Sequence, residues 1–145
     1  MDTQTLRKQH EEIGETSEAL INAVIARDRL EVAKCRWRLA RVLIAHLAIE
    51  DKWLYPALIR DGSTRASTMA LNFQREMGGL IAAFNAYMLD WNEDRITNEW
   101  EAFQTATWKL VEARDLRTRR ENAQLYSLAE AERAAVRPAG GTTRP

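Results

Sequence analysis

Apolar residues recur every three or four positions along almost the whole chain, which is the spacing that places side chains on one face of an α-helix. No stretch shows the strict alternation of apolar and polar residues that indicates a half-buried β-strand. Helix-starting and helix-ending signals divide the pattern into segments at about residues 3–27, 28–61 and 98–133, with one more that begins at residue 63 or 64. Four long helices joined by short links predict an all-α fold, an up-down-up-down four-helix bundle.

The predicted boundaries of the second and fourth helices depend on short capping motifs. Asp28 with Glu31 forms a capping box for the second helix, and Asn98 with Glu101 forms another for the fourth. Pro56 predicts an irregularity within the second helix, because proline cannot donate a backbone hydrogen bond.

The third helix and the C-terminal end carry small residues with a structural meaning. Ser63 or Thr64 can cap the third helix, in which Gly78 and Gly79 would allow a neighbour to approach closely. The last residues, PAGGTTRP, are poor in side chains that can pack. We therefore predict one bundle domain over residues 1–134 and a disordered tail over residues 135–145.

The charge balance and the cysteine content limit which classes of function and which cellular compartment we expect. The chain holds 21 basic and 21 acidic residues, whereas nucleic-acid surfaces and anchors for acidic membranes need a basic excess. Cys35 is the only cysteine, so no internal disulfide can form and a reducing compartment fits. The N-terminus lacks the apolar centre of a signal peptide, and no apolar stretch is long enough to span a membrane. We expect a cytoplasmic protein that binds neither nucleic acid nor membrane.

An eleven-residue segment of the second helix recurs without gaps in the fourth. It reads HLAIEDKWLYP from His46 and RTRRENAQLYS from Arg117, which suggests a duplicated helical hairpin. The identical pairs are Glu50 and Glu121, Leu54 and Leu125, and Tyr55 and Tyr126. In the first copy a histidine and a glutamate lie four residues apart, on one helical face, where they can hold one metal ion together. The second copy keeps the carboxylate but replaces the imidazole with a permanent cation.

Four ionisable residues are predicted to point into the bundle, because apolar residues lie one turn before or after each of them. They are His10, His46, Glu50 and Glu121. The same reasoning places Trp53 inside. A hydrogen-bonded core histidine is the alternative explanation for each imidazole, but buried carboxylates need a partner, since an unpaired buried charge is strongly destabilising.

These motifs resemble the hemerythrin-like, HHE-type cation-binding family from about residue 6 to 130. The matching pieces are LRKQHEEI around His10, HLAIEDKWLYP around His46 and Glu50, and RTRRENAQLYS around Glu121. The resemblance implies a hemerythrin-like four-helix bundle around a non-haem di-iron centre, to which these four side chains would be ligands.

Two histidine positions of the family are substituted in this chain. Met77, in FQREMGGL, and Arg117 stand at these positions. A thioether is a poor ligand for ferric iron, and a guanidinium is not a ligand at all. We therefore expect an eroded di-iron site, in which Arg117 replaces iron as a built-in cation that pairs with Glu121 and reaches Glu50. Met77 would fill the volume of the missing histidine. The alternative is that the head of Arg117 extends to the surface.

The eroded site favours a regulatory or interaction protein without a bound cofactor. We expect such a protein to act in signalling or stress response, through contacts with another protein or as a homodimer. Trp37, Trp100 or Trp108 would be the exposed anchors of that contact. The chain offers no Ser/His/Asp or Cys/His arrangement for nucleophilic catalysis and no phosphate-binding glycine loop, so we expect no enzymatic activity.

Two other hypotheses remain open at this stage. In the first, His10, His46, Glu50 and Glu121 hold non-haem iron or zinc at reduced stoichiometry, and the protein responds to oxygen, redox state or nitric oxide. In the second, a small ligand binds in an apolar channel near Met77 and Gly78.

Overall fold

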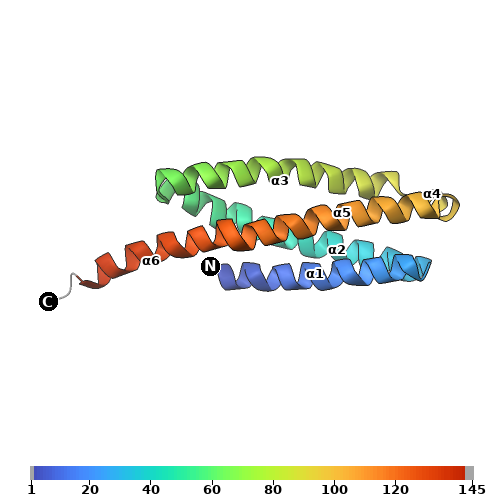
Figure 1. The fold of residues 1–145 in the computed structure, drawn as a ribbon, viewed down its shortest axis with the longest axis horizontal. Helices are drawn as coiled ribbons and strands as arrows, with labels where there is room; N and C mark the ends of the chain where they lie inside the picture. The colour runs from blue at the N-terminus through green and yellow to red at the C-terminus, as the bar shows by residue number, and fades with distance from the viewer. Residues whose placement is uncertain (1, 143–145) are drawn as a thin grey trace.

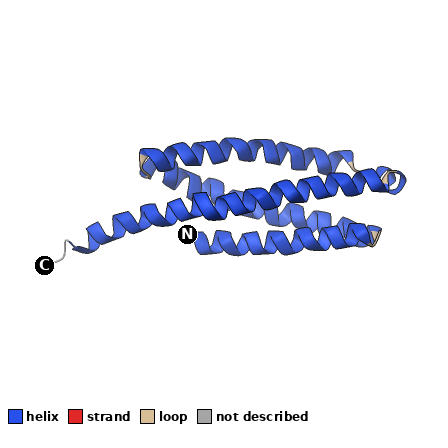
Figure 2. Ribbon diagram, viewed as in Figure 1, coloured by secondary structure: helices blue, strands red, loops and turns tan. Residues whose placement is uncertain are grey.

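The computed structural model describes the backbone of residues 2–142 and the side chains of residues 2–135. Helix accounts for nearly all of the described backbone, which contains no strand, and the loops are confined to short turns (Figure 2). The long helices are α1 (Thr3–Ile25), α2 (Arg29–Ile49), α3 (Thr64–Asp90) and α5 (Trp100–Arg120). They alternate in direction along the bundle (Figure 1), so the predicted all-α, up-down-up-down bundle is confirmed.

Both copies of the internal repeat contain a π-helical turn that begins at the carboxylate. The turn η1 (Glu50–Leu54) follows α2, and η3 (Glu121–Tyr126) follows α5. A second turn, η2 (Ala57–Asp61), comes directly after Pro56, which confirms the predicted irregularity there. A π-helical turn accommodates an extra residue and is frequent at functional sites, because it rotates the side chains that follow it.

The rotation in η1 explains one orientation that the sequence predicts wrongly. Trp53 is 49% exposed, although simple helical periodicity places it inside. The next two residues, Leu54 and Tyr55, are buried in its place. The extra residue of the π-helical turn therefore shifts the inward face by about one position.

The helix caps agree with the sequence at α2 and α3 but not at α5. The Asp28 side chain accepts a hydrogen bond from the backbone N–H of Glu31, at 3.2 Å, and Ser63 caps α3. Asn98, in contrast, is the last residue of a short extra helix, α4 (Glu93–Asn98), and α5 begins after Glu99 without a side-chain cap. The extra helix turns the chain so that apolar residues on both sides of the junction become buried, among them Ile96 and Trp100.

Gly78 and Gly79 do not have the packing role that the sequence suggests. The helix α3 continues through both residues. A Cβ atom added at either position would meet nothing within 4 Å, so no neighbour approaches closely there.

The apolar core has two clusters, and the four ionisable residues lie between them along the helices. One cluster, towards α4, contains Ile13, Leu43 and Phe103, and the other contains Leu6 and Leu54. His10 lies between Leu6 and Ile13 in the sequence of α1. Polar groups at mid-bundle are thereby sealed from solvent at both ends.

The chain continues beyond the predicted end of the domain. The helix α6 (Ser127–Thr142) follows η3, and its last part projects away from the other helices (Figure 1). Its backbone is helical up to Thr142, where the sequence predicts a disordered tail over 135–145, and residues 143–145 lie outside the described residues. The disorder of the tail and the domain boundary at 134 stay predictions.

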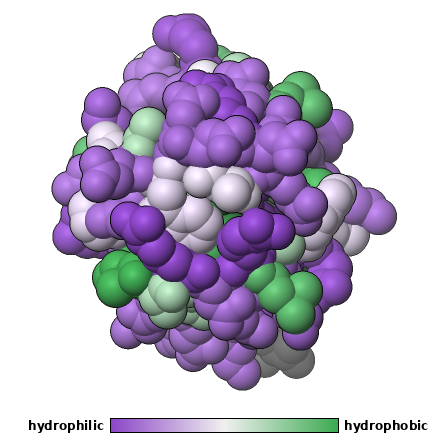
Figure 3. All heavy atoms as spheres, turned by 90° about the vertical axis from the view of Figure 1, so that its right-hand side faces the viewer, coloured by the Kyte–Doolittle hydropathy of each residue, from purple (hydrophilic) through white to green (hydrophobic). Residues whose placement is uncertain are grey.

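The surface at the α4 end of the bundle is mostly hydrophilic, and its apolar side chains form separate small spots (Figure 3). None of the described helices combines the length and the apolar character that crossing a lipid bilayer requires.

Candidate metal centre

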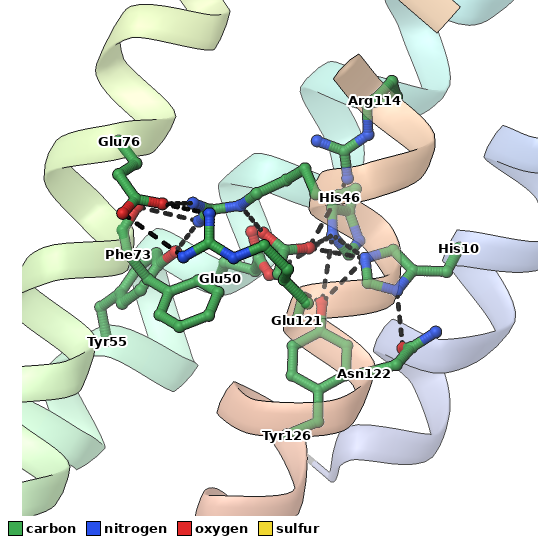
Figure 4. A network of polar contacts seen from close by, with 12 residues as sticks. His10, His46, Glu50, Tyr55, Phe73, Glu76, Arg114, Glu121, Asn122 and Tyr126 are labelled. Atoms are coloured by element: carbon green, nitrogen blue, oxygen red, sulfur yellow. Dashed lines mark hydrogen bonds and ion pairs between the residues drawn. The ribbon is translucent and has the colours of Figure 1, made fainter. Parts of the chain in front are cut away.

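Four buried side chains from three parts of the fold converge at mid-bundle, where we call them the tetrad (Figure 4). The tetrad consists of His10 on α1, His46 on α2, Glu50 at the start of η1 and Glu121 at the start of η3. His10 is 3% exposed and the other three are 0% exposed. One ligand atom from each residue lies within 4.8 Å of all the others. The structure therefore brings together all four residues that the sequence selects.

Side-chain amides fix the orientation of both imidazole rings. The Nδ1 atom of His10 lies 2.8 Å from Oδ1 of Asn122, and Nδ1 of His46 lies 2.9 Å from Oε1 of Gln9. A carbonyl oxygen can only accept, so each Nδ1 carries a hydrogen and each Nε2 faces the tetrad. Metal-ligating histidines have this arrangement, in which one ring nitrogen donates outward and the other is available for the metal.

The inward atoms are mainly hydrogen-bond acceptors, and they crowd one another. The two Nε2 atoms are 3.1 Å apart, and Nε2 of His10 lies 2.7 Å from Oε1 of Glu121. Nε2 of His46 is 3.4 Å from Oε2 of Glu50. Lone pairs at these distances repel unless a cation lies among them, and the cation can be a metal ion or a proton.

The protonation preferences of this region follow from its buried charges. Burial alone would lower the pKa of His46, but the adjacent carboxylates of Glu121 and Glu50 outweigh burial and raise it above its ordinary value. Burial favours the protonated form of Glu121, yet contact with the imidazoles of His10 and His46 and the nearby arginines hold its pKa well below the usual range. The tetrad thus attracts positive charge, because ionised carboxylates are its dominant feature.

Tyr126 extends its hydroxyl into the tetrad from η3 (Figure 4). The hydroxyl donates to Oε2 of Glu50 at 2.7 Å and lies 3.1 Å and 3.2 Å from Nε2 of His10 and His46. Burial and the adjacent Glu50 raise the pKa of Tyr126, so the phenol keeps its proton. The Tyr126 hydroxyl can therefore donate a hydrogen bond to Glu50, or to an oxygen atom of a molecule bound at the tetrad.

One oxygen of the tetrad has no partner. Oε1 of Glu50 is fully buried and makes no hydrogen bond within the described residues. An unsatisfied buried carboxylate oxygen is costly, and buried charges in proteins are normally paired or bind metal. Two imidazoles and two carboxylates, one of which has an unpartnered oxygen, would hold a metal ion, so these residues fit a bound metal.

Arg117 is an internal cation on the other side of Glu121. Its side chain is 1% exposed, and its Nε donates to Oε2 of Glu121 at 2.6 Å. One terminal nitrogen donates to the hydroxyl of Tyr55 at 3.0 Å and to the backbone oxygen of Phe73 at 2.9 Å. The predicted ion pair with Glu121 is confirmed, and the alternative with an exposed guanidinium is wrong. No hydrogen bond or ion pair joins Arg117 to Glu50 in the described part of the chain, because Arg117 reaches Tyr55 instead.

Phe73 and Glu76, rather than Met77, are the α3 residues in contact with Arg117, whose second terminal nitrogen lies 3.6 Å from Oε2 of Glu76. The guanidinium carbon of Arg117 lies 4.7 Å from the centre of the Phe73 ring, a cation–π contact. Met77 lies one turn further along α3, is 5% exposed and lines an apolar cavity. The prediction that Met77 fills the volume of the missing histidine stays a prediction, while Phe73 provides the aromatic contact to Arg117.

A second buried arginine was missed by the sequence analysis. Arg114 is 8% exposed, and a terminal nitrogen lies 3.6 Å from Oε1 of Glu121. In Figure 4 it approaches from the side of the tetrad opposite Tyr126. Arg114 lies seven residues before Glu121, which places both on one helical face, so the spacing alone could have indicated it. Tyr126 could have been selected because it is one of the identical positions of the repeat. Gln9 and Asn122 have no sequence signal except that they are next to His10 and Glu121.

The fold and the tetrad together define a class of protein, a four-helix bundle with an internal histidine and carboxylate cluster that can bind metal. The sequence profile of the hemerythrin HHE cation-binding domain matches residues 1–129, and the chain belongs to this family. The family typically binds non-haem iron. No curated protein and no solved structure gives a significant match to the chain.

Proposed function

We propose that this hemerythrin-like domain binds a single transition-metal ion at the tetrad, with the guanidinium of Arg117 in place of a second metal. The two oxygens of Glu121 support this proposal. Oε1 faces His10 at 2.7 Å, whereas Oε2 accepts from Arg117 at 2.6 Å. One carboxylate is thus shared between a histidine cluster and a permanent cation, where a di-metal centre would share it between two ions.

The surroundings of Arg117 leave little reason for a second ion. The guanidinium is held by a carboxylate, a phenol and a backbone oxygen, and it stacks on the ring of Phe73. A metal ion next to this fixed positive charge would be repelled at low dielectric. The tetrad side also has a guanidinium nearby, because Arg114 lies 3.6 Å from Oε1 of Glu121, but that side offers an unpartnered oxygen of Glu50 and Nε2 of both imidazoles.

The donor set suits iron or zinc. Two imidazoles and two carboxylates are ligands that both metals accept. Bound iron would supply a redox-active centre able to take up a diatomic molecule, whereas bound zinc would supply structural stability. The chain itself supplies orientation through Gln9 and Asn122, a protonated phenol from Tyr126, and exclusion of bulk water by the flanking apolar clusters.

The role that fits these features is non-catalytic and regulatory. A single buried ion held by a tightly packed bundle suits a domain that changes stability or shape with metal or redox state. We propose that such a change is communicated through the surface of the bundle in the cytoplasm, to another protein or a second copy. Trp37 and Trp108, at 72% and 42% exposed, are the proposed anchors, whereas Trp100 is buried and donates to the backbone oxygen of Val24.

Metal content tests the proposal directly. The protein would be purified without chelator, or stripped and reloaded anaerobically with Fe²⁺ or with Zn²⁺, and analysed for metal per chain. We expect about one ion per chain, together with a rise in melting temperature on loading. Two ions per chain would show that Arg117 does not replace a metal.

Matched carboxamide variants locate the ion. Glu50→Gln removes a charge from the tetrad and should strongly reduce metal retention. Glu112→Gln removes an exposed carboxylate of α5 that makes no hydrogen bond or ion pair within the described residues, so it should retain metal as the unchanged protein does. Equal metal content in the two variants would place the ion elsewhere.

A metal-free interaction protein is the second candidate. The observation that favours it is that both carboxylates have donors within the protein, since Arg117 donates to Glu121 and Tyr126 donates to Glu50. If the reloaded protein binds neither Fe²⁺ nor Zn²⁺, the single-metal proposal fails and this candidate replaces it.

A further inference from the structure

An apolar cavity of about 260 Å³ lies within the bundle next to the tetrad. Residues of α1, α2, α3 and α5 line it, including Leu43, Met77 and Phe84. Trp37 and Ile44 also line it and are 72% and 67% exposed, so the cavity opens to solvent between α2 and α3. Its size suits a molecule smaller than an average drug.

Two unsatisfied polar side chains line this otherwise apolar space. Ser17 is 2% exposed and Arg114 is 8% exposed. The Ser17 hydroxyl, together with Nε and one terminal nitrogen of Arg114, has no hydrogen-bond partner in the described residues. Buried donors without partners are rare and costly, so each requires an explanation.

The carboxylate next to Arg114 does not satisfy it. Glu121 is 3.6 Å away, beyond hydrogen-bond distance, and it already accepts from Arg117 and contacts His10. The guanidinium of Arg114 therefore has fixed positive charge and free N–H groups beside an apolar wall. An anionic group of a ligand would complete it.

We propose that this cavity binds a medium-chain free fatty acid. Its carboxylate would accept from Arg114 and Ser17, and its alkyl chain would lie along Leu43, Met77 and Phe84 towards Trp37. A guanidinium fork matches a planar carboxylate, and the single charge of a carboxylate suits one arginine better than a phosphate dianion does. The apolar walls select a ligand with a hydrocarbon body, and each buried methylene raises the affinity about fourfold.

Titration with decanoate tests the proposal, with decanol as the matched uncharged ligand. Binding would be followed by calorimetry and by tryptophan fluorescence, in metal-free and in metal-loaded protein. We expect decanoate to bind at one site per chain and at least ~10-fold more tightly than decanol, because it alone forms charge-assisted hydrogen bonds. Equal affinities, or no saturable binding of decanoate, would overturn the proposal. Binding to metal-free protein is independent of the single-metal proposal, so the two can fail separately.

Substitutions separate the head group from the hydrocarbon wall. Arg114→Met should weaken decanoate at least ~10-fold and leave decanol unchanged, whereas Arg119→Met, on the exposed face of the same helix, should change neither. Ser17→Ala, which removes an unpaired hydroxyl, should fold normally and weaken decanoate about threefold or more.

A cavity-filling variant provides a third test, which does not depend on the stability of the Arg114 variant. Ala40→Leu places extra methyl groups in the cavity wall and should weaken decanoate and decanol alike. If Arg114→Met proves unstable, Ser17→Ala and Ala40→Leu decide the question, and decanoate affinity unchanged in both would reject this cavity as the site.

Discussion

Each half of the molecule faces a tyrosine of the other half. His46 and Glu50, in the first half, contact Tyr126 of the second. Arg117, in the second half, contacts Tyr55 of the first. Both halves start a π-helical turn at the carboxylate, so the backbone frame is the same. The two halves differ in whether their buried carboxylate oxygens have partners. Arg117 brings its own charge and leaves both oxygens of Glu121 engaged, while Oε1 of Glu50 remains without a partner. One frame can thus provide a ligand set on one side and a permanent ion pair on the other.

The largest expected effect comes from removing the permanent cation. Arg117→Met removes the guanidinium closest to the buried Glu121, leaving Arg114 at 3.6 Å, and removes the donors to Tyr55 and Phe73. Breaking a buried pair in this way typically costs about 3–5 kcal/mol, and we expect a loss of that size in the free energy of unfolding, measured by denaturant titration. Arg119→Met, on the same helix but exposed, should stay within about 0.5 kcal/mol of the unchanged protein. A loss below about 1 kcal/mol for Arg117→Met would mean that the second half does not depend on its cation.

Removing the amides that orient the rings should affect the first half. Gln9→Ala and Asn122→Ala free Nδ1 of His46 and His10, and substitutions of this kind typically lower metal affinity about 10–100-fold. Competition with a chelator of known affinity measures the change. Gln124→Ala is the control, because this exposed side chain on the same turn as Asn122 makes no hydrogen bond within the described residues, and it should retain the affinity.

The two tyrosines allow the comparison to be made with one matched pair of substitutions. Tyr55→Phe removes an acceptor from Arg117 and should lower the free energy of unfolding by about 1 kcal/mol without changing metal content. Tyr126→Phe removes the donor to Glu50 and should alter metal affinity instead. If both variants change the same property, the division of roles between the halves is wrong.

The smallest effect is expected on α3, which belongs to the second half. Gly78 is in the interior of this helix, and a Cβ atom there meets nothing within 4 Å. Gly78→Ala should therefore stabilise the protein by about 0.5–1 kcal/mol in thermal or denaturant unfolding, and metal content should not change. A destabilised protein would show that α3 needs the glycine for motion or for a partner.

The sequence was informative about the site where side-chain chemistry and helical spacing agree. His10, His46, Glu50 and Glu121 could be selected because apolar residues on both sides fix the direction of each one. The pairing of Arg117 with Glu121 followed in the same way from their separation of four residues.

Other parts of the structure depend on features that spacing does not encode. The rotation at the π-helical turn η1 exposes Trp53, and a one-residue insertion in the hydrogen-bond pattern has no periodic signal. The packing of the helices decides which side chain accepts a hydrogen bond from the terminal nitrogen of Arg117. Sequence spacing therefore could not show that this acceptor is Tyr55 rather than Glu50. The extra helix α4 depended on burial of Ile96, which outweighed the capping motif at Asn98.

The amides that hold the imidazole rings connect the site crosswise. Gln9 orients His46 on another helix, while its sequence neighbour His10 is oriented by Asn122, the neighbour of Glu121. Neither ring reaches its final orientation until α1 has docked against both α2 and η3. The tetrad is therefore complete only when α1 is docked, and under the single-metal proposal a partly folded chain that lacks the docked α1 should capture metal poorly. The cell would then load the ion into finished domains, which limits the release of loosely held metal from incomplete ones.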